Sequence, residues 1–332
     1  MIVSRTPFRI SFFGGGTDFP IWYNKHGGSV ISSTIDKYCY INLRKLPPFF
    51  DHKYSIRYKE RETVNSISQI KHPSVKHCFK TYLKKGDCLE LVHHADLPDR
   101  SGIGSSSSFT VGLLNCIVSY KKKKISKRNL ALSAINVEQN KIRENVGSQD
   151  QTAASYGGLN KINFSRNKKF TVNKIFMKDS SFKKLNDSLV LFFTGFSRNS
   201  SEITKYYLKN MKNNESKLLE ISQITNEAFN VFQSKEIDIK KMGFYLNESW
   251  KLKRNLSNKV SNELIDKIYQ NGINYGAYGG KLLGAGSGGF ICFLVEPSEK
   301  KNFISRFKNL LHIPINLENS GSKIIYNNEN IK

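Results

Sequence analysis

The amino-acid sequence predicts an α+β protein with two domains. Segments rich in β-branched and aromatic residues are mixed with grouped helical segments, rather than alternating regularly with single helices as in a parallel α/β sheet. The 332 residues exceed what one hydrophobic core usually serves, which favours two domains packed together. No low-complexity linker marks the boundary, and we place it after residue 165, giving domains over 1–165 and 166–332.

The first domain is expected to combine four strands with three helices. Runs of β-branched and aromatic residues predict strands over 2–13, 30–43, 90–94 and 159–164. Apolar residues at helical spacing predict a helix over 109–120, and Ser126 is a plausible N-cap for a second helix ending near Arg143. A short third helix is expected from about Ser148 to the Tyr156-Gly157-Gly158 stop.

The second domain is expected to hold a buried strand over 189–193, three helical segments between about 200 and 271, and a strand over 290–295.

The composition is that of an ordinary globular protein with a strong basic excess. Hydrophobic residues make up 39% and charged residues 24%, which excludes disordered, collagen-like and coiled-coil classes. Lys and Arg number 52 against 27 Asp and Glu, so the formal net charge is +25. Such a surface attracts phosphate groups, nucleic acid or anionic membrane, and the charge alone does not choose among them. The lysine run at 121–124 is interpreted as a solvated loop after a helix.

Cysteine usage and hydropathy favour a cytoplasmic protein without a membrane segment. The five cysteines form an odd set without CxxC, which argues for a reducing compartment, and no secretory signal is recognised. The uncharged stretch 101–120 begins with glycines and serines that are too polar for lipid, so no membrane partner is expected. Histidines and cysteines between His72 and His94 lack the spacing of a zinc site.

The strongest motif is the segment Pro98-Asp-Arg-Ser-Gly-Ile-Gly-Ser-Ser-Ser-Ser108, which lies between a predicted strand and a predicted helix. Glycines allow close backbone approach to an anion, and a helix N-terminus offers free N–H groups and a positive dipole end. The segment therefore indicates a phosphate-binding loop, although it matches neither the Walker A nor the GxGxxG pattern. A Gly/Ser turn that merely caps a helix is the alternative.

Two further glycine-rich segments accompany it. Thr6-Pro-Phe-Arg-Ile-Ser-Phe-Phe-Gly-Gly-Gly-Thr-Asp18 places an arginine and an acid around a turn, and Leu283-Gly-Ala-Gly-Ser-Gly-Gly-Phe290 leads into a strand. In order and content the three motifs resemble those of the GHMP kinases, the superfamily of galactokinase, homoserine kinase, mevalonate kinase and phosphomevalonate kinase. The resemblance implies an N-terminal lobe like ribosomal protein S5 domain 2, a ferredoxin-like C-terminal lobe, and a site between them.

The resemblance also implies roles for individual residues in binding ATP and Mg²⁺. Gly102, Ile103, Gly104, Ser105, Ser106, Ser107 and Ser108 would wrap the ATP phosphates. Ser106, with Ser105 as second choice, would place a hydroxyl near Mg²⁺, and Glu138 matches the family's magnesium-binding glutamate.

Asp150 matches the family's aspartate that faces the accepting hydroxyl, as a general base or chiefly as an orienting group. Arg9 would stabilise charge on the transferring phosphoryl group or lower the pKa of the acceptor. Without the resemblance, Glu138 reads as an exposed helix acid and Asp150 as a capping residue.

The acceptor site is implied by the first and third motifs. Asp18 resembles the sugar-binding aspartate of the galactokinase branch, whereas Gly15 and Gly16 replace that branch's Glu-His pair, which puts galactose in doubt. Further substrate-binding residues are expected at Gly15, Gly16, Thr17, Gly286, Ser287 and Gly288. For a substrate that already carries phosphate we expect a second anion site at Arg198 and the serine-rich helix start after it, with an ordinary N-cap and surface arginine as the alternative.

The first motif and Gly147-Ser-Gln-Asp-Gln-Thr-Ala-Ala-Ser-Tyr-Gly-Gly158 look like the sugar-1-kinase branch that acts on D-glycero-D-manno-heptose 7-phosphate, with the fucokinase domain a near neighbour. The expected activity is ATP-dependent phosphorylation of the anomeric hydroxyl to give the 1,7-bisphosphate, for nucleotide-activated heptose in capsule or lipopolysaccharide synthesis. A kinase for another sugar such as fucose or galactose is the alternative. A basic RNA-binding protein is a distant one, because no RNP-like or KH signature is present, so no nucleic-acid partner is expected. No oligomeric state is indicated.

Overall fold

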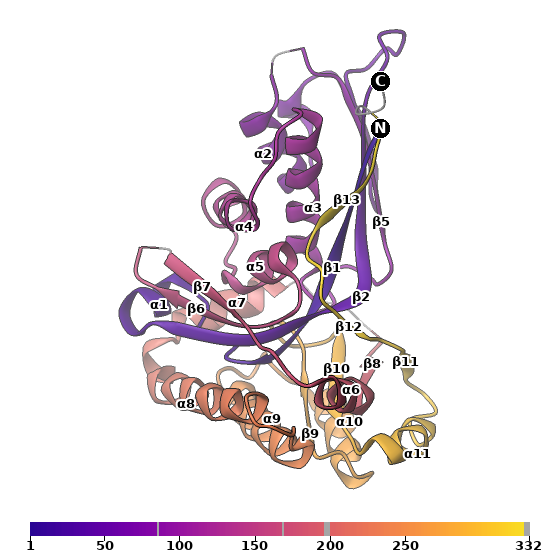
Figure 1. Cartoon of the computed structure of the whole chain (residues 1–332). Coiled ribbons are helices and arrows are strands. Elements are labelled where there is room, and N and C mark those ends of the chain that lie inside the picture. The colour runs from indigo at the N-terminus through magenta and orange to yellow at the C-terminus, as the bar shows by residue number, and fades with distance from the viewer. Residues whose placement is uncertain (85, 168, 196–199, 329–332) are drawn as a thin grey trace.

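Two sheets organise the chain, which a computed structural model describes over residues 1–84, 86–167, 169–195 and 200–328. Each sheet carries its own helices (Figure 1). We call the part built on the larger sheet the N-lobe and the part built on the smaller sheet the C-lobe. The predicted α+β class is confirmed.

The N-lobe sheet has the strand order β13-β1-β2-β5-β3-β4, with β6 and β12 also paired to β2, and β7 paired to β6. The long strand β2 connects the parts of this sheet, because it pairs with β1 along most of its length, with β5 through its second half and with β6 through its first residues. The strands are β1 (Ile2–Phe13), β2 (Gly28–Lys45), β3 (Tyr54–Arg57), β4 (Arg61–Val64), β5 (Leu89–Ala95), β6 (Leu159–Ser165), β7 (Lys169–Lys174), β12 (Leu317–Glu318) and β13 (Lys323–Asn327).

Helices α2 to α5 lie together on one side of this sheet (Figure 1). α3 packs closest, since the Ser4 hydroxyl of β1 donates to the Gly112 carbonyl at 3.0 Å. This contact holds the middle of α3 against β1, and near the start of the helix the Ser108 hydroxyl donates to the Pro7 carbonyl of β1 at 3.0 Å. The N-lobe helices are α1 (Pro20–His26), η1 (Ile67–Gln69), α2 (Pro73–Tyr82), α3 (Ser105–Tyr120), α4 (Lys127–Ile135), the π-helical η2 (Asn136–Ile142) and α5 (Gln149–Tyr156).

The C-lobe sheet is antiparallel, in the order β11-β8-β10-β9. β10 is buried along its whole length, as its uninterrupted apolar run predicts. The strands of this sheet are β8 (Leu189–Phe193), β9 (Gly279–Leu282), β10 (Phe290–Leu294) and β11 (Leu311–Ile313). The helices are α6 (Asp179–Ser188), α7 (Ser200–Lys209), η3 (Lys212–Asn214), α8 (Glu215–Phe232), α9 (Ile239–Arg254), α10 (Glu263–Asn274), η4 (Pro297–Glu299) and α11 (Lys300–Ser305).

The two sheets do not divide the chain at residue 165. β7 follows that position yet pairs with β6, and the last strands, β12 and β13, return to the N-lobe to pair with β2 and β1. The first and last described residues therefore lie side by side, and the Asn328 N–H donates to the Met1 carbonyl at 3.0 Å. By sheet membership the C-lobe is an insertion between β7 and β12.

The predicted central elements are confirmed, with shifts at their ends. Ser126 caps α4 through the Asn129 N–H, but the helix expected to run to Arg143 changes to the wider π-helical η2 at Asn136. Four α-helices, not three, occupy the region from 200 to 274. The short strands β3, β4, β7, β9, β11, β12 and β13 and helices α1, α2, α6 and α11 were not anticipated.

The histidines that superficially suggested zinc serve as aromatic packing. The His72 ring stacks on Phe109 at 4.5 Å between centroids, and the His93 ring meets Phe109 edge-on at 5.1 Å. Burial lowers the pKa of both histidines to about 4, so both rings are neutral at physiological pH. Among the described residues, no group of three or more His, Cys, Asp or Glu is arranged to hold a metal ion.

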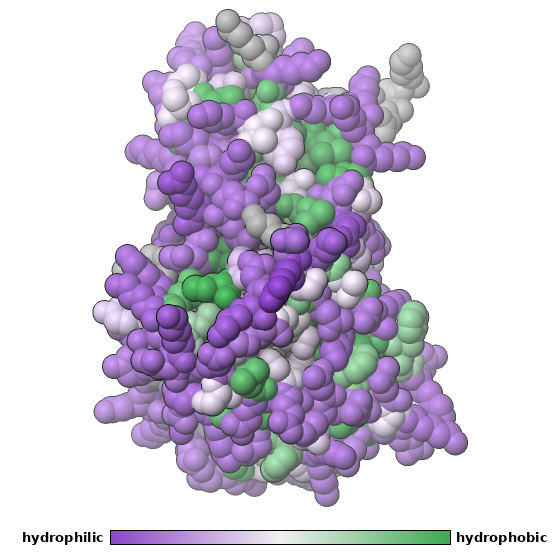
Figure 2. Space-filling model, turned by 90° about the vertical axis from the view of Figure 1, so that its left-hand side faces the viewer, coloured by the Kyte–Doolittle hydropathy of each residue, from purple (hydrophilic) through white to green (hydrophobic). Residues whose placement is uncertain are grey.

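The face shown in Figure 2 is mostly hydrophilic, with hydrophobic residues in small separate areas. In the part of the chain that the structure describes, every helix is too short or too polar to cross a membrane.

Candidate active site

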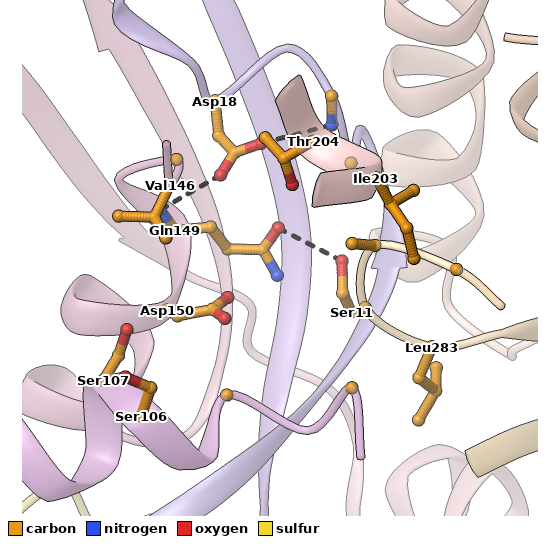
Figure 3. A pocket seen from close by; sticks show the side chains of 18 of the residues that line it. Ser11, Asp18, Ser106, Ser107, Val146, Gln149, Asp150, Ile203, Thr204 and Leu283 are labelled. Carbon is orange, nitrogen blue, oxygen red and sulfur yellow. Dashed lines mark hydrogen bonds between the residues drawn. The ribbon is translucent and has the colours of Figure 1, made fainter. Parts of the chain in front are cut away.

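A cavity between the two lobes collects most of the residues singled out in the sequence. Counting the space open to solvent, its volume is about 1260 Å³, more than one small ligand fills. The N-lobe contributes its floor and one wall, and Ile203, Thr204 and Leu283 of the C-lobe face them (Figure 3).

The phosphate-loop segment forms one edge of this cavity. Gly102, Gly104, Ser105, Ser106 and Ser107 line it. Gly104 caps α3 in a left-handed conformation with φ of 77°, which explains the need for glycine there. Because α3 begins at Ser105, its first N–H groups and positive dipole end lie at the cavity, as an anion site requires.

Two residues of the same segment do not line the cavity. The Ile103 carbonyl accepts the Arg9 N–H at 3.1 Å, and the Ser108 hydroxyl donates to the Pro7 carbonyl at 3.0 Å. Both are buried and tie the loop to β1. Their place in the loop is structural, while the glycines and Ser105 to Ser107 offer the contacts to a ligand.

Arg9 and Asp150 form an ion pair at the centre of the site. Arg9 Nε donates to Asp150 Oδ1 at 2.8 Å, and Arg9 Nη2 donates to Oδ2 at 2.7 Å. Nη1 donates to the Gly102 carbonyl at 2.6 Å. The Arg9 side chain is only 6% exposed, against 29% for Asp150, so the carboxylate remains open to the cavity while the guanidinium holds it from behind.

Asp18 lies near Asp150 as a second acid on the cavity wall (Figure 3). Its carboxylate accepts the Gly16 N–H at 3.2 Å and the Gln149 N–H at 3.3 Å. Burial and the neighbouring Asp150 raise the pKa of Asp18 to about 6, although these two backbone donors oppose the shift. Two backbone donors leave oxygen lone pairs for the hydroxyls of a ligand.

Around Asp18, Gly15 and Gly16 line the cavity, but Thr17 does not. The Thr17 hydroxyl is buried and donates to the carbonyls of Gly14 and Ser29, at 2.9 and 3.0 Å. Thr17 therefore shapes the turn that presents Asp18, rather than contacting a ligand itself.

Glu138 is buried on η2, directly behind the start of α3. Its Oε2 accepts the Ser107 hydroxyl at 2.9 Å and the Gln151 side-chain amide. Its Oε1 has no hydrogen-bond partner among the described residues. Burial raises the pKa of Glu138 to about 7, against the effect of these donors. An unpartnered buried carboxylate oxygen beside a hydroxyl is an arrangement that fits a hard cation such as Mg²⁺.

The structure links Glu138 to Ser107, whereas the sequence pointed to Ser106. Ser106 is exposed on the cavity wall, and both serines lie near Asp150 (Figure 3). The two hydroxyls thus have different surroundings, one held by the acid and one facing the open space.

The third glycine segment closes the cavity from the C-lobe. Gly286 and Gly288 line it, whereas the buried Ser287 donates its hydroxyl to the Lys259 carbonyl. Gly284 lies against Gly102, so closely that a Cβ on either residue would collide with the backbone of the other segment. Arg198, the expected second anion site, lies outside the described residues; α7 begins just after it at Ser200.

Sequence reasoning missed several lining residues. Arg100 and Gln149 lie within the recognised motifs, yet no role had been assigned to them. Ile203, Thr204 and Lys253 come from amphipathic C-lobe helices, where nothing in the local pattern distinguishes a cavity residue from a core or surface residue.

Comparison with known proteins agrees with this geometry. Residues 73–158 match the family described as GHMP kinases N terminal domain, and residues 230–312 match GHMP kinases C terminal. The chain is 30% identical over 316 residues to D-glycero-alpha-D-manno-heptose 7-phosphate kinase of Campylobacter jejuni, covering 92% of this chain and 93% of that protein. It is 27% identical to galactokinase of Pyrococcus furiosus, covering 90% of each chain.

A solved structure shares the fold over nearly the whole length. The D-glycero-D-manno-heptose 1-phosphate kinase from Bacteroides thetaiotaomicron has a TM-score of 0.81 at 22% identity, covering 98% of this chain and 100% of that one. Both domain families, the full-length relative and the fold agree, so the chain belongs to the GHMP kinase family and is a phosphotransferase.

Proposed function

We propose that this protein is an ATP-dependent sugar-1-kinase that phosphorylates the anomeric hydroxyl of D-glycero-D-manno-heptose 7-phosphate to the 1,7-bisphosphate. The observation that carries the proposal is the placement of Asp150 and Asp18 together on the wall next to the glycine loop. One acid faces the position of a reacting hydroxyl, and the other can accept hydrogen bonds from further hydroxyls of the same sugar. The similarity to the Campylobacter heptose 7-phosphate kinase supports the choice of sugar.

In this proposal each wall of the cavity has a separate task. The glycine loop and the start of α3 hold the ATP phosphates, and Asp18 fixes the ring of the sugar. Asp150 orients the accepting hydroxyl and receives its proton, while Arg9 fixes the Asp150 carboxylate and offsets negative charge at the transferring phosphoryl group. Glu138 with Ser106 or Ser107 would hold Mg²⁺, which neutralises charge between the phosphate oxygens when bound.

Ser106 and Ser107 are both candidate ligands of Mg²⁺, and the Mg²⁺ dependence of the rate after removal of each hydroxyl distinguishes them. If Ser106 contacts Mg²⁺, Ser106→Ala raises the Mg²⁺ concentration for half-maximal rate about tenfold, a change on the order of one ligand contact. Ser107→Ala then changes it less, because that hydroxyl is occupied by Glu138. Mg²⁺ titrations of the rate for both variants and the wild type measure this. A larger effect for Ser107→Ala would transfer the role to Ser107.

A substrate panel tests the proposed function. Formation of ADP from ATP and Mg²⁺ is measured with hexoses, fucose, galactose and heptoses, each with and without a terminal phosphate. We expect kcat/KM for heptose 7-phosphate to exceed that for the unphosphorylated heptose by about 10²-fold or more, because a bound phosphate provides several charge-assisted hydrogen bonds. If fucose or galactose is turned over as fast as heptose 7-phosphate or faster, the proposed substrate is wrong, although the protein is still a sugar kinase.

A further inference from the structure

A lysine of the C-lobe, Lys253, projects into the active-site cavity near the end of α9. It is half-buried, and its ammonium group donates to the carbonyl of Gly284 in the third glycine segment. One hydrogen bond occupies one of the three N–H donors of a lysine, so the group retains donors for a ligand in the cavity.

Lys253 and Arg9 approach the same point from opposite lobes. Arg9 Nη1 binds the carbonyl of Gly102, and Lys253 Nζ binds the carbonyl of Gly284. The backbones of Gly102 and Gly284 are in direct contact with each other. The side chains of Arg9 and Lys253 are therefore held where the Gly102 and Gly284 segments touch, beside the phosphate-loop segment that lines the cavity.

When no ligand is bound, the groups around the contact between Gly102 and Gly284 destabilise the charged form of Lys253. Burial and the neighbouring Arg9 lower the pKa of Lys253 to about 8, and Asp18 and Asp150 only partly oppose them. Lys281, buried in β9, donates to the Phe12 carbonyl at 2.8 Å, and burial together with the nearby Lys253 and Arg9 holds the pKa of Lys281 well below its usual value. Arg9 is already committed to Asp150. An anion placed between Arg9 and Lys253 would relieve their repulsion.

We propose that Lys253 binds the phosphoryl group during transfer, from the C-lobe side and opposite Arg9. This proposal rests on the proposed function for the chemistry, but not for the identity of the sugar. In the transfer, the acceptor oxygen bonds to the γ-phosphorus, the bond to the bridging oxygen breaks, and its electron pair leaves with ADP. The hydroxyl proton passes to Asp150, while Lys253 keeps its protons and stabilises the equatorial oxygens.

Three variants test the assignment on the sugar that the wild type turns over best. Lys253→Met keeps the length of the side chain and removes the charge, whereas Lys253→Arg keeps the charge. Lys251→Met is the matched control, because Lys251 lies on the same helix, is 55% exposed and pairs with Glu248. We expect Lys253→Met to lower kcat by about 10²-fold to 10³-fold with KM for ATP changed less than about threefold, as for loss of a transition-state contact. Lys253→Arg retains kcat within about tenfold of the wild type.

The pH profile separates this role from mere support of the Gly284 segment. For the wild type, kcat/KM falls as the pH rises above about 8, because the free enzyme then loses the proton of Lys253. In Lys253→Arg this alkaline fall shifts to higher pH, since a guanidinium stays charged. The other ionisable groups facing Lys253, namely Arg9, Asp18, Asp150 and Lys281, are unchanged in this variant.

The proposal is overturned if the kcat of Lys253→Met lies within about threefold of the kcat of Lys251→Met while the Tm of Lys253→Met equals that of the wild type.

If the wild type phosphorylates no sugar, the proposed function fails, and the role of Lys253 is tested by ligand binding alone. The probe is then aluminium fluoride, added to the protein together with ADP and Mg²⁺. In Lys251→Met this mixture has to raise the Tm more than ADP and Mg²⁺ alone do. In Lys253→Met the additional rise in Tm has to disappear. An increment that persists in Lys253→Met, or one missing from Lys251→Met, overturns the assignment.

Discussion

Asp150→Asn is expected to lower kcat by about 10²-fold to 10⁴-fold, the range for losing a positioned acid–base group in a preorganised site. The amide keeps the shape of the side chain, but it can no longer accept from both Arg9 Nε and Nη2 or receive a proton. Arg9, which is only 6% exposed, would lose its charged partner. Because an unpaired buried charge also costs stability, Tm is measured first and the assays are run well below it.

Asp187→Asn serves as the control for this change. Asp187 is half-buried on α6, where it pairs with Lys183, and it does not line the cavity. We expect its kcat to equal that of the wild type. Asp150→Asn with nearly normal kcat in a folded protein would remove Asp150 from the reaction.

The same variant distinguishes proton removal from orientation. A fluorine next to the anomeric carbon makes the accepting hydroxyl more acidic and reduces the need for a base. If Asp150 removes the proton early, the loss caused by Asp150→Asn shrinks with the fluorinated sugar. If Asp150 chiefly orients the hydroxyl, the loss is the same for both acceptors.

Glu138→Gln is expected to make the metal-free protein more stable at pH 8 while reducing kcat by about 10²-fold or more, because the proposed Mg²⁺ site then lacks its carboxylate. The hydrogen bonds from Ser107 and Gln151 both reach Oε2, so a glutamine oxygen can accept them, and its amide replaces Oε1, which has no hydrogen-bond partner among the described residues. The substitution thus removes a buried charge while keeping these two hydrogen bonds.

The sign of the stability change follows from the pKa of Glu138, which is raised from 4.5 to about 7 in the folded protein. The folded state binds this proton more tightly than the unfolded state, so the wild type loses stability as the pH rises from about 4.5 to about 7. A shift of this size corresponds to roughly 3 kcal/mol. Relative to the wild type, Glu138→Gln gains stability over that window and keeps the gain above pH 7.

Thermal unfolding from pH 5 to 8, with and without Mg²⁺, measures this effect. Added Mg²⁺ should raise the Tm of the wild type at pH 8 and leave that of Glu138→Gln unchanged, since a metal that binds the native state stabilises it. Glu220→Gln, an exposed acid on α8, is the control and should behave like the wild type. Equal Mg²⁺ stabilisation of Glu138→Gln and the wild type would exclude Glu138 as a ligand.

The site depends on contacts between the lobes as well as on the residues within each. Gly102 touches Gly284, and the Phe290 N–H of the C-lobe donates to the Ser101 carbonyl at 3.0 Å. Lys281 of β9 adds its bond to the Phe12 carbonyl of β1. These bonds converge on the phosphate loop and on the strand that carries Arg9. Residues of both lobes therefore hold the cavity in shape.

Features that depend on a few neighbouring residues were determined by the sequence itself. The left-handed cap at Gly104, the Ser126 cap and the buried strand β10 each follow from local conformational preference or from a short apolar run. For the same reason, the segment 98–108 could be interpreted from its residues as a phosphate-binding loop, whereas the roles of the other two glycine segments came from the family resemblance. Half of the residues in the three segments line one cavity.

Only the tertiary structure determines which residues from other parts of the chain contact these segments. Successive residues of a helix point about 100° apart, so the packing of α3 against η2 determines that Ser107, and not Ser106, reaches Glu138. The return of β12 and β13 to the N-lobe and the place of Lys253 opposite Arg9 join segments more than 200 residues apart. An amphipathic pattern tells which face of an element is buried but not its partner, because that partner is chosen by the packing of the whole chain.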